Sequence, residues 1–491
     1  MKPLRLSEVA RMAGGHLNGE DVLVDAIATD TRAMPEGGRA LFVALKGERF
    51  DGHAHVADAA LHGARAALVE HAVVADIPQI GVADTERALA ALAAALQSGR
   101  SGKVVAITGS NGKTTVKALL LSILQGAGRA YANPGNRNNE IGLPLAVIDA
   151  PDDADFAVYE MGAGKPGDIA YLTRVVRPDV SLVNNIAPAH LERMGSLLGV
   201  ADTKAAIYDA LPADGVAVIN ADDAFAPYFA ERAHGRRLIR FGIEASADVR
   251  ARDIRAEGDG MRFTLAAPEG EAEVMLPLAG RHNVRNALAA AALALGAGAS
   301  LEAVVAGLAA AQPVAGRMIR HALGNGAILI DDSYNANPGS LNAAIDLLSA
   351  RTQAAVQGEA WLVLGDMREL GADAQALHAE AGRRAKAAGI ARLYALGELS
   401  AHAAQAFGEG ARTFDSHDAL TDALRRDIHA FVGAALAANA FGDADSGREK
   451  AIAAKAAPTV AAPTILVKGS RGSAMDRVVR QVLEQETAHA A

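Results

Sequence analysis

The chain has 491 residues, a formal net charge of −9 at pH 7 and 51% hydrophobic residues. A chain of this length is too long to fold around one hydrophobic core, so we predict about three domains of roughly 150 residues. The negative charge argues against a general nucleic-acid binder, and the absence of cysteine excludes disulfides, thiol catalysis and cysteine-bound zinc. The N-terminal segment lacks the apolar run of a secretory signal, and the alanine-rich stretch at 88–96 is too short to cross a bilayer. We therefore expect a cytoplasmic protein with no membrane insertion.

Apolar runs alternate with helical patterns along most of the chain. Up to residue 100 the pattern is mixed, with runs at 41–45 and 66–69. Candidate strands follow at 103–107, 156–159, 180–183 and 216–219, which favours a mainly parallel sheet. Past residue 313, strands at 327–330, 361–364, 393–396 and 464–467 alternate with helices from 340 and 374. This second series is typical of a doubly wound sheet.

The fold class predicted from this order is α/β, with three domains. A small mixed α/β domain occupies residues 1–100, a central parallel-sheet domain 101–313, and a C-terminal Rossmann-like domain 314–491. The segment 437–463 is rich in Ala, Gly, Asp and Lys with little periodicity. We interpret that segment as a flexible surface insertion.

A glycine-rich turn between the strand at 103–107 and the following helix has the features of a phosphate loop. Its residues are Gly109, Ser110, Asn111, Gly112, Lys113, Thr114 and Thr115. Glycines allow the amides to face phosphate oxygens, and the helix N-terminus adds partial positive charge. Lys113 can neutralise the β and γ phosphates, and a threonine hydroxyl can bind magnesium. Ile107 stands where the usual loop has its first glycine, so this is a shorter variant. The turn predicts ATP binding, but kinases, motors, switches and ligases all use such loops.

Further motifs, in their order along the chain, resemble the Mur ligase superfamily. They are NRNNEIGLP at 136–144, EMGA at 160–163, NNIAPAHLE at 184–192, GRHNVRNA at 280–287, GR at 316–317 and DDSYNANP at 331–338. Each motif is moderately specific, but their joint order is highly specific and covers nearly the whole chain. The resemblance implies an ATP-dependent amide-bond ligase whose central domain binds ATP.

Three residues of the central domain are candidates for metal binding and catalysis. Glu160 and His190 follow predicted strands, at the edge where α/β folds place their ligands, and both side chains suit divalent cations. Lys204 matches the lysine that this superfamily carbamylates. A buried lysine readily loses its proton, and CO2 then converts its amine into a carbamate, an anion that binds magnesium. With Thr114, these residues form the expected metal site. The alternatives are a surface acid at 160, a capping histidine at 190 and a solvated lysine at 204.

The resemblance also implies contacts to the rest of ATP. Asn283 and Asn286 would approach the adenine, Arg317 the γ phosphate, and Asp332 the ribose. ATP would then bind between the central and C-terminal domains, whose closure would exclude water. Alternative roles remain for these residues: the asparagines could cap a helix, Arg317 could be a solvated charge, and Asp332 could cap a turn.

The N-terminal segments TDTR at 29–32, LFVALKG at 41–47 and DGH at 51–53 resemble the UDP-binding domain of the two later Mur ligases. We expect the UDP-linked substrate to contact Thr31, Arg32 and Lys46, together with Asn138 and Asn139. Polar turns are the alternative for these residues.

The C-terminal motifs bear on the acceptor. The Asp-Asn-Pro-Arg signature of the diaminopimelate-adding ligase is absent, whereas LGDMRELG at 364–371 and VKGSRG at 467–472 resemble the branch that adds D-alanyl-D-alanine. Asp366, Lys468 and Arg471 would bind this acceptor, although ordinary strand-end polar residues are the alternative.

The expected reaction uses ATP and Mg²⁺, with a carbamate on Lys204, to join UDP-N-acetylmuramoyl-tripeptide to D-alanyl-D-alanine through an acyl phosphate. These two substrates are the expected partners, and we expect a monomer. The alternatives are a Mur ligase that adds the third residue, a folylpolyglutamate synthetase or a P-loop NTPase regulator. The sequence indicates neither the third residue of the tripeptide nor the base that deprotonates the amine.

Overall fold

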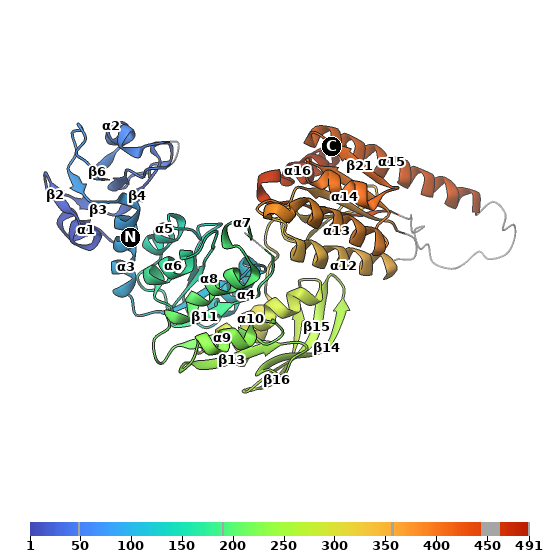
Figure 1. The fold of residues 1–491 in the computed structure, drawn as a ribbon, viewed down its shortest axis with the longest axis horizontal. Helices are drawn as coiled ribbons and strands as arrows, with labels where there is room; N and C mark the ends of the chain where they lie inside the picture. Colours follow the sequence, from blue (N-terminus) through green and yellow to red (C-terminus); the bar gives the residue numbers. More distant parts are fainter. Residues whose placement is uncertain (48–49, 189–190, 355–357, 443–461, 490–491) are drawn as a thin grey trace. The chain divides into compact units, whose positions relative to one another are not determined.

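The computed structural model describes residues 1–47, 50–188, 191–354, 358–442 and 462–489 (Figure 1). The chain forms two compact units. The first comprises Met1–Ile186, Leu198–Pro277 and Asn283–Ala311, and the second comprises Ala187–Leu197, Leu278–His282 and Gln312–Ala491. No described helix combines the length and apolar composition needed to cross a membrane.

The N-terminal part of the first unit contains a five-stranded sheet in the order β2-β7-β6-β5-β4. Its strands are β2 (His16–Asn18), β4 (Ala26–Ala28), β5 (Ala40–Val43), β6 (Ala64–Val69) and β7 (Gln79–Gly81), beside a two-stranded pair of β1 (Leu4–Arg5) and β3 (Leu23–Val24). The helices are α1 (Leu6–Ala13), α2 (Val56–Leu61) and α3 (Thr85–Ser98). All pairs in the larger sheet are parallel except β2 with β7. The apolar runs predicted at 41–45 and 66–69 form β5 and β6.

A nine-stranded sheet forms the larger part of the first unit, in the order β16-β15-β14-β13-β12-β11-β8-β10-β9. Its first six strands are β8 (Lys103–Thr108), β9 (Ala130–Ala132), β10 (Phe156–Glu160), β11 (Val180–Val183), β12 (Val216–Asn220) and β13 (Arg237–Gly242). All pairs among these six are parallel, as predicted. Because β8 lies between β10 and β11, the loop after β8 is at a topological switch point, where such sheets bind ligands.

The helices of this part of the chain are α4 (Lys113–Gln125), α5 (Gly142–Asp149), α6 (Asp168–Val176), α7 (Leu191–Met194), α8 (Leu197–Asp209), α9 (Ala226–Arg232), α10 (Arg281–Gly296) and α11 (Leu301–Ala309). The phosphate-loop helix α4 begins at Lys113, within the glycine-rich turn. Residues Val104 to Thr108 of β8 are all buried, as expected for a central parallel strand covered on both faces.

The sequence analysis missed the antiparallel extension of this sheet, which consists of β14 (Val249–Glu257), β15 (Gly260–Ala267) and β16 (Gly270–Leu276). A two-residue turn at Gly258 and Asp259 joins the first pair, and a two-residue turn is a strong hairpin signal. Charged residues obscured the alternation of apolar ones, because Arg262 lies between the buried Met261 and Phe263 and pairs with Glu257.

The second unit contains a six-stranded sheet in the order β17-β18-β22-β19-β20-β21. Its strands are β17 (Ile319–Ala322), β18 (Ile328–Asp332), β19 (Ala360–Gly365), β20 (Arg392–Leu396), β21 (Ala411–Phe414) and β22 (Thr464–Lys468). Its helices are α12 (Pro338–Ala354), α13 (Ala374–Ala387), α14 (Ser400–Phe407), α15 (His417–Gly442) and α16 (Asp476–His489). Only the edge strand β17 is antiparallel among the described strands of this sheet.

The six-stranded sheet is covered on both faces, as the doubly wound prediction requires (Figure 1). Leu362 and Leu364 of β19 pack with residues of α12, α13 and α14, whereas Trp361 and Val363 pack with residues of α15 and α16. This alternation follows from the two-residue period of a strand. Helix α15 extends through Gly442 into the predicted insertion 437–463, and residues 443–461 of that insertion lie outside the described part.

Candidate functional site

The loop between β8 and α4 depends on two glycines with positive φ, +144° at Gly109 and +79° at Gly112. A β-carbon at Gly112 would lie 2.4 Å from Asn286 Oδ1 and 2.6 Å from Asn184 Nδ2. Glycine is therefore required at 112 both by the backbone conformation and by the close approach of two asparagines. The structure thus brings the predicted residue Asn286 directly against the phosphate loop.

A network of asparagines supports this loop. Asn184 follows β11, and its Nδ2 donates to the Asn111 carbonyl at 2.9 Å and to Asn286 Oδ1 at 3.2 Å. Asn286 Nδ2 in turn donates to Asn283 Oδ1 at 3.2 Å. Asn185 accepts the Ser110 amide on its carbonyl and the Asn111 amide on its side chain. The amides of Ser110 and Asn111 therefore face protein oxygens, so backbone contacts to a phosphate would come from the start of α4.

Two lysines influence each other at this loop. Lys113 Nζ donates to the Gly109 carbonyl at 2.7 Å. The Lys204 side chain extends from α8 and is 1% exposed. Burial, and then the charge of Lys113, hold the pKa of Lys204 well below its usual value, and Asp168 acts in the opposite direction. Lys204 is therefore not the solvated lysine of the alternative interpretation, and burial favours the neutral amine with which CO2 reacts.

Glu160, at the end of β10, is buried and held on both carboxylate oxygens. Its Oε1 accepts a hydrogen bond from Asn138 Nδ2 at 3.0 Å, and its Oε2 lies 3.3 Å from Lys117 Nζ. Lys117 also donates to the Asn133 carbonyl at 2.8 Å. A surface acid is thereby excluded at 160. The sequence analysis missed Lys117, whose signal is its place one turn after Lys113, among the buried residues of α4.

The oxygens around the loop fit a hard divalent cation. Glu160 stands opposite Ile107 in the β8–β10 pairing, and Thr114 lies in the first turn of α4, the helix that follows β8. A carboxylate and a hydroxyl are oxygen donors of the kind that Mg²⁺ prefers. His190 lies outside the described residues, and within the described ranges no three His, Asp or Glu side chains gather as a metal cluster.

The residues predicted for the UDP substrate lie in two places. Thr31 and Arg32 belong to a short 3-10 helix, and Arg32 is paired with Asp30 at 2.6 Å with its side chain 87% exposed. Lys46 is exposed. Asn138 lies on the segment after β9, bonded to Glu160, and Asn139 Oδ1 caps the Gly142 amide at the start of α5.

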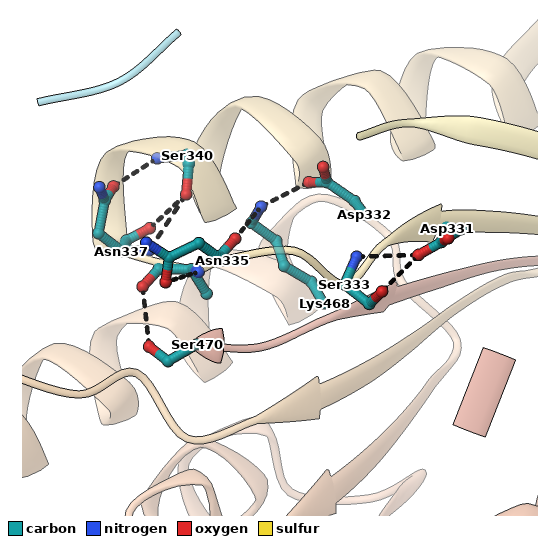
Figure 2. A network of polar contacts seen from close by, with 9 residues as sticks. Asp331, Asp332, Ser333, Asn335, Asn337, Ser340, Lys468 and Ser470 are labelled. Carbon is teal, nitrogen blue, oxygen red and sulfur yellow. Dashed lines mark hydrogen bonds and ion pairs between the residues drawn. The ribbon is translucent and has the colours of Figure 1, made fainter. Parts of the chain in front are cut away.

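In the second unit, the predicted ribose and acceptor residues Asp332 and Lys468 bind each other. Figure 2 shows Lys468 at the end of β22 reaching the Asp332 carboxylate, with Nζ 2.5 Å from Oδ2, and the Asn335 carbonyl at 3.0 Å. Their side chains are only 3% and 13% exposed. Ser470 Oγ donates to the Ala336 carbonyl in the same network. Lys468 therefore holds the loop at 332–337 in place.

The other two predicted acceptor residues differ in their environment. Asp366, after β19, accepts from both the amide and the hydroxyl of Ser400 at 2.8 Å and so caps α14. Arg471 is exposed, with its guanidinium carbon 5.2 Å from the centre of the Tyr334 ring. The predicted phosphate ligand Arg317 lies over the same ring at 4.3 Å. The structure thus brings Arg317 and Arg471 together at Tyr334, which sequence reasoning did not single out.

Three family profiles together match most of the chain. The profile of the Mur ligase family catalytic domain matches residues 23–97, that of the Mur ligase middle domain matches 107–294, and that of the Mur ligase glutamate ligase domain matches 316–471.

Individual proteins match along nearly the full length. The UDP-N-acetylmuramoyl-tripeptide--D-alanyl-D-alanine ligase of Escherichia coli (strain K12) is 41% identical over 488 residues, 99% of this chain and 100% of that protein. Its Bacillus subtilis (strain 168) namesake is 34% identical, over 82% of this chain and 86% of that protein. A crystal structure of MurF from Acinetobacter baumannii has a TM-score of 0.85 and 32% identity, covering 99% of both chains. MurF from Thermotoga maritima in complex with ADP has a TM-score of 0.78 and 26% identity, covering 95% of this chain and 99% of that chain.

Proposed function

Because this chain belongs to the Mur ligase family, we propose that it joins D-alanyl-D-alanine to UDP-N-acetylmuramoyl-tripeptide with conversion of ATP to ADP and phosphate. This amide-bond ligation is a step in the synthesis of peptidoglycan precursors. Full-length relatives that carry this name support the substrates. The observation that carries the chemistry is the position of Lys113, Glu160 and the buried Lys204 around one phosphate loop.

In the first step, a terminal carboxylate oxygen of the tripeptide attacks the γ phosphorus of ATP. The bond from that phosphorus to the β-γ bridging oxygen breaks, so the products are an acyl phosphate and ADP. The chain's contribution is positive charge and position. Lys113 lies at the loop, where its ammonium can leave the Gly109 carbonyl for a phosphate oxygen. Arg317 is assigned to the γ phosphate on the family resemblance.

In the second step, the neutral amine of D-alanyl-D-alanine attacks the activated carbonyl. A tetrahedral intermediate forms, and phosphate leaves with the oxygen that came from the carboxylate. The amine must lose its proton before or during the attack. Water must be kept from the acyl phosphate, because hydrolysis of this intermediate would release phosphate without forming an amide.

The metal site proposed for this reaction consists of Thr114, Glu160 and Lys204, with His190 as a further ligand. Lys117 and Asn138 hold the Glu160 carboxylate in one orientation. Lys204 enters this set as its carbamate, formed when the neutral amine takes up CO2, and its burial supports this assignment. Bound Mg²⁺ would supply positive charge for the phosphate oxygens. Asn283 and Asn286 remain the proposed adenine contacts, and Asp332 the ribose contact.

We assign the UDP-linked substrate to Thr31, Arg32 and Lys46 in the N-terminal domain, together with Asn138 and Asn139. Arg32 and Lys46 are exposed and can meet a diphosphate. We further propose that the protein is a monomer and that it works in the cytoplasm, where ATP and nucleotide-linked precursors are found. The proposed domains are 1–100, 101–313 and 314–491.

The test supplies ATP, Mg²⁺ and UDP-muramoyl tripeptide and measures phosphate release with and without D-alanyl-D-alanine. We expect release that depends on the dipeptide and matches a new amide product one to one. Turnover that needs no acceptor and forms no amide would instead indicate an NTPase regulator.

The Lys113→Ala variant tests the nucleotide site. We expect loss of turnover, because the loop loses the cation nearest the transferred phosphoryl group. Lys103→Ala is a matched control, since Lys103 is exposed at the opposite end of β8. Near-normal activity of Lys113→Ala would contradict the assignment of this loop.

A further inference from the structure

The ring of Tyr334 lies against the guanidinium of Arg317, the residue assigned to the γ phosphate. The guanidinium carbon of Arg317 stands 4.3 Å from the centre of the Tyr334 ring. We propose that Tyr334 is a positioning residue, which holds the Arg317 guanidinium in the orientation that phosphoryl transfer requires. This inference rests on the proposed function and adds one residue to its first step.

The fold brings these two residues together from opposite ends of a strand pair. Strands β17 and β18 are antiparallel, with Ile319 paired to Asp331. Arg317 precedes β17 by two residues, and Tyr334 follows β18 by two residues. In an antiparallel pair, the segment before one strand runs beside the segment after the other. The contact between Arg317 and Tyr334 therefore follows from the pairing of the two strands.

The backbones of the two segments also meet. The Tyr334 amide donates to the Gly316 carbonyl at 3.1 Å. A β-carbon at Gly316 would lie 3.1 Å from Tyr334 Cβ, and the φ of Gly316 is +70°. On the other side of Arg317, Met318 has a φ of +57°, a conformation that is uncommon for a residue with a side chain. Such conformations persist only where the surroundings hold them, so the backbone that carries Arg317 is fixed in place.

The loop that carries the ring is held on both sides of Tyr334. On one side, the Asp332 carboxylate accepts a hydrogen bond from the buried Lys468 ammonium (Figure 2). On the other side, the Asn335 carbonyl accepts from the same ammonium at 3.0 Å. Tyr334 thus lies between two residues that one lysine fixes, and its ring offers Arg317 a surface of defined position.

Stacking on a ring suits an arginine that binds phosphate. The electron-rich face of an aromatic ring attracts a cation, and a guanidinium lies flat on it. The N–H donors of a guanidinium lie in the plane of the group, so a ring against its face does not compete for them. The ring instead restricts the rotamers of a long side chain. The arginine then loses less conformational entropy when it meets the charge that develops on the γ phosphate.

A second arginine approaches the same ring, but less closely. The guanidinium carbon of Arg471 is 5.2 Å from the ring centre, and Arg471 is exposed, whereas Arg317 is half-buried. We therefore expect the ring to govern the orientation of Arg317 more strongly than that of Arg471. The strength of a cation–aromatic contact rises as the cation is withdrawn from water, which favours the same assignment.

The test is a double-mutant cycle between Tyr334 and Arg317. Single turnovers with γ-³²P-labelled ATP, UDP-muramoyl tripeptide and D-alanyl-D-alanine give the rate of labelled phosphate release, so that slow variants stay measurable. We expect Tyr334→Leu to lower this rate about 3- to 30-fold, because the guanidinium loses its ring. Tyr334→Phe keeps the ring and should stay within about twofold of the wild type. In an Arg317→Ala background, Tyr334→Leu should change the rate by less than about twofold, since the group that it orients is gone.

A change in the electrons of the ring, at constant shape, provides a second measurement. Pentafluorinated phenylalanine at position 334 has the size of phenylalanine but lacks the electron-rich face. We expect its rate to fall about 3- to 30-fold below that of Tyr334→Phe. A ring that only fills space would give equal rates for the two, so this comparison does not depend on how well Tyr334→Leu folds.

Nucleotide affinity separates positioning from general damage to the site. ADP lacks the γ phosphate, so we expect its dissociation constant to stay within about twofold of the wild-type value in Tyr334→Leu. Phe414→Leu is the matched control, because it removes another ring of the same unit that has an arginine against it, with the Arg412 guanidinium carbon 5.2 Å from the ring centre. We expect this control to leave both the rate and the ADP affinity unchanged.

The outcomes separate the inference from the function on which it rests. A wild type that releases no phosphate in response to the dipeptide contradicts the proposed function, and with it the role of Arg317. An active wild type with an equally fast Tyr334→Leu variant overturns the positioning role alone. The same conclusion follows if Tyr334→Leu costs as much in the Arg317→Ala background, if fluorination leaves the rate unchanged, or if ADP affinity falls as far as the rate.

Discussion

Replacing Gly112 by alanine perturbs the phosphate loop at its most crowded point. The new β-carbon would lie 2.4 Å from Asn286 Oδ1 and 2.6 Å from Asn184 Nδ2, far inside van der Waals contact. These two atoms belong to side chains that hydrogen-bond to each other at 3.2 Å and are both buried. The alanine therefore either breaks this bond or moves the loop away from it.

Two effects set the size of the change. Alanine at φ +79° costs about 1–2 kcal/mol relative to glycine. Separating the buried amides of Asn184 and Asn286 costs about 1–3 kcal/mol. The sum, about 2–5 kcal/mol, corresponds to amide exchange at least about 25-fold faster in the first turns of α4, where opening governs exchange. Affinity for a non-hydrolysable ATP analogue should fall by about tenfold or more.

Hydrogen exchange resolved by peptide is the suitable assay. The single tryptophan, Trp361, lies in the second unit and is not part of this loop. Gly433→Ala serves as the control, because a β-carbon there meets nothing within 4 Å and the residue lies inside α15. We expect it to stabilise the chain by about 0.5–1 kcal/mol. Exchange and nucleotide affinity of Gly112→Ala close to those of the wild type would refute the account of the loop.

Two further predictions concern the second unit. Lys468→Met leaves a buried Asp332 carboxylate without its cation, so we expect a loss of about 3–5 kcal/mol in unfolding free energy, and a smaller loss when Asp332→Asn is added. Urea unfolding followed by Trp361 fluorescence measures both, and equal losses in the single and double variants would exclude coupling. His378 is buried, accepts the Met367 amide on Nε2 at 2.9 Å and has its Nδ1 at the Ala374 carbonyl. Burial lowers the pKa of this imidazole below its ordinary value of 6.5. Between pH 6.5 and the lower pKa of the folded state, the unfolded state binds more protons. Stability should therefore fall as the pH drops across this window and level off below the folded pKa. His378→Gln should lose that pH dependence, whereas an unchanged acid limb in this variant would show that another group titrates.

Much of the fold was predictable because the decisive signals are local. The buried residues 104–107 and 465–467 form continuous apolar runs, and the turn from Gly109 to Lys113 carries its own conformational requirements. The β14–β16 extension escaped prediction, since exposed arginine and glutamate ladders interrupt its alternation.

The sequence predicts which residues belong to the candidate site, but it does not predict their contacts with one another. Lys204 and Glu160 are buried as the metal-site prediction requires, but a periodic pattern does not show that Lys117 meets Glu160. Lys468 and Asp366 sit at strand ends, where sequence reasoning favours ligand contact. Lys468 instead binds Asp332, about 130 residues away in the chain, and Asp366 binds Ser400, about 30 residues away. That choice depends on the three-dimensional packing.

The proposed reaction activates the tripeptide carboxylate by phosphoryl transfer from ATP. Its most direct test uses UDP-muramoyl tripeptide with ¹⁸O at both oxygens of the reacting carboxylate, together with ATP, Mg²⁺ and D-alanyl-D-alanine. The isotope in the released phosphate is then measured by mass spectrometry. We predict one ¹⁸O atom per phosphate, in step with amide formation. Phosphate without the label, formed at the same rate as the amide, would contradict the acyl phosphate.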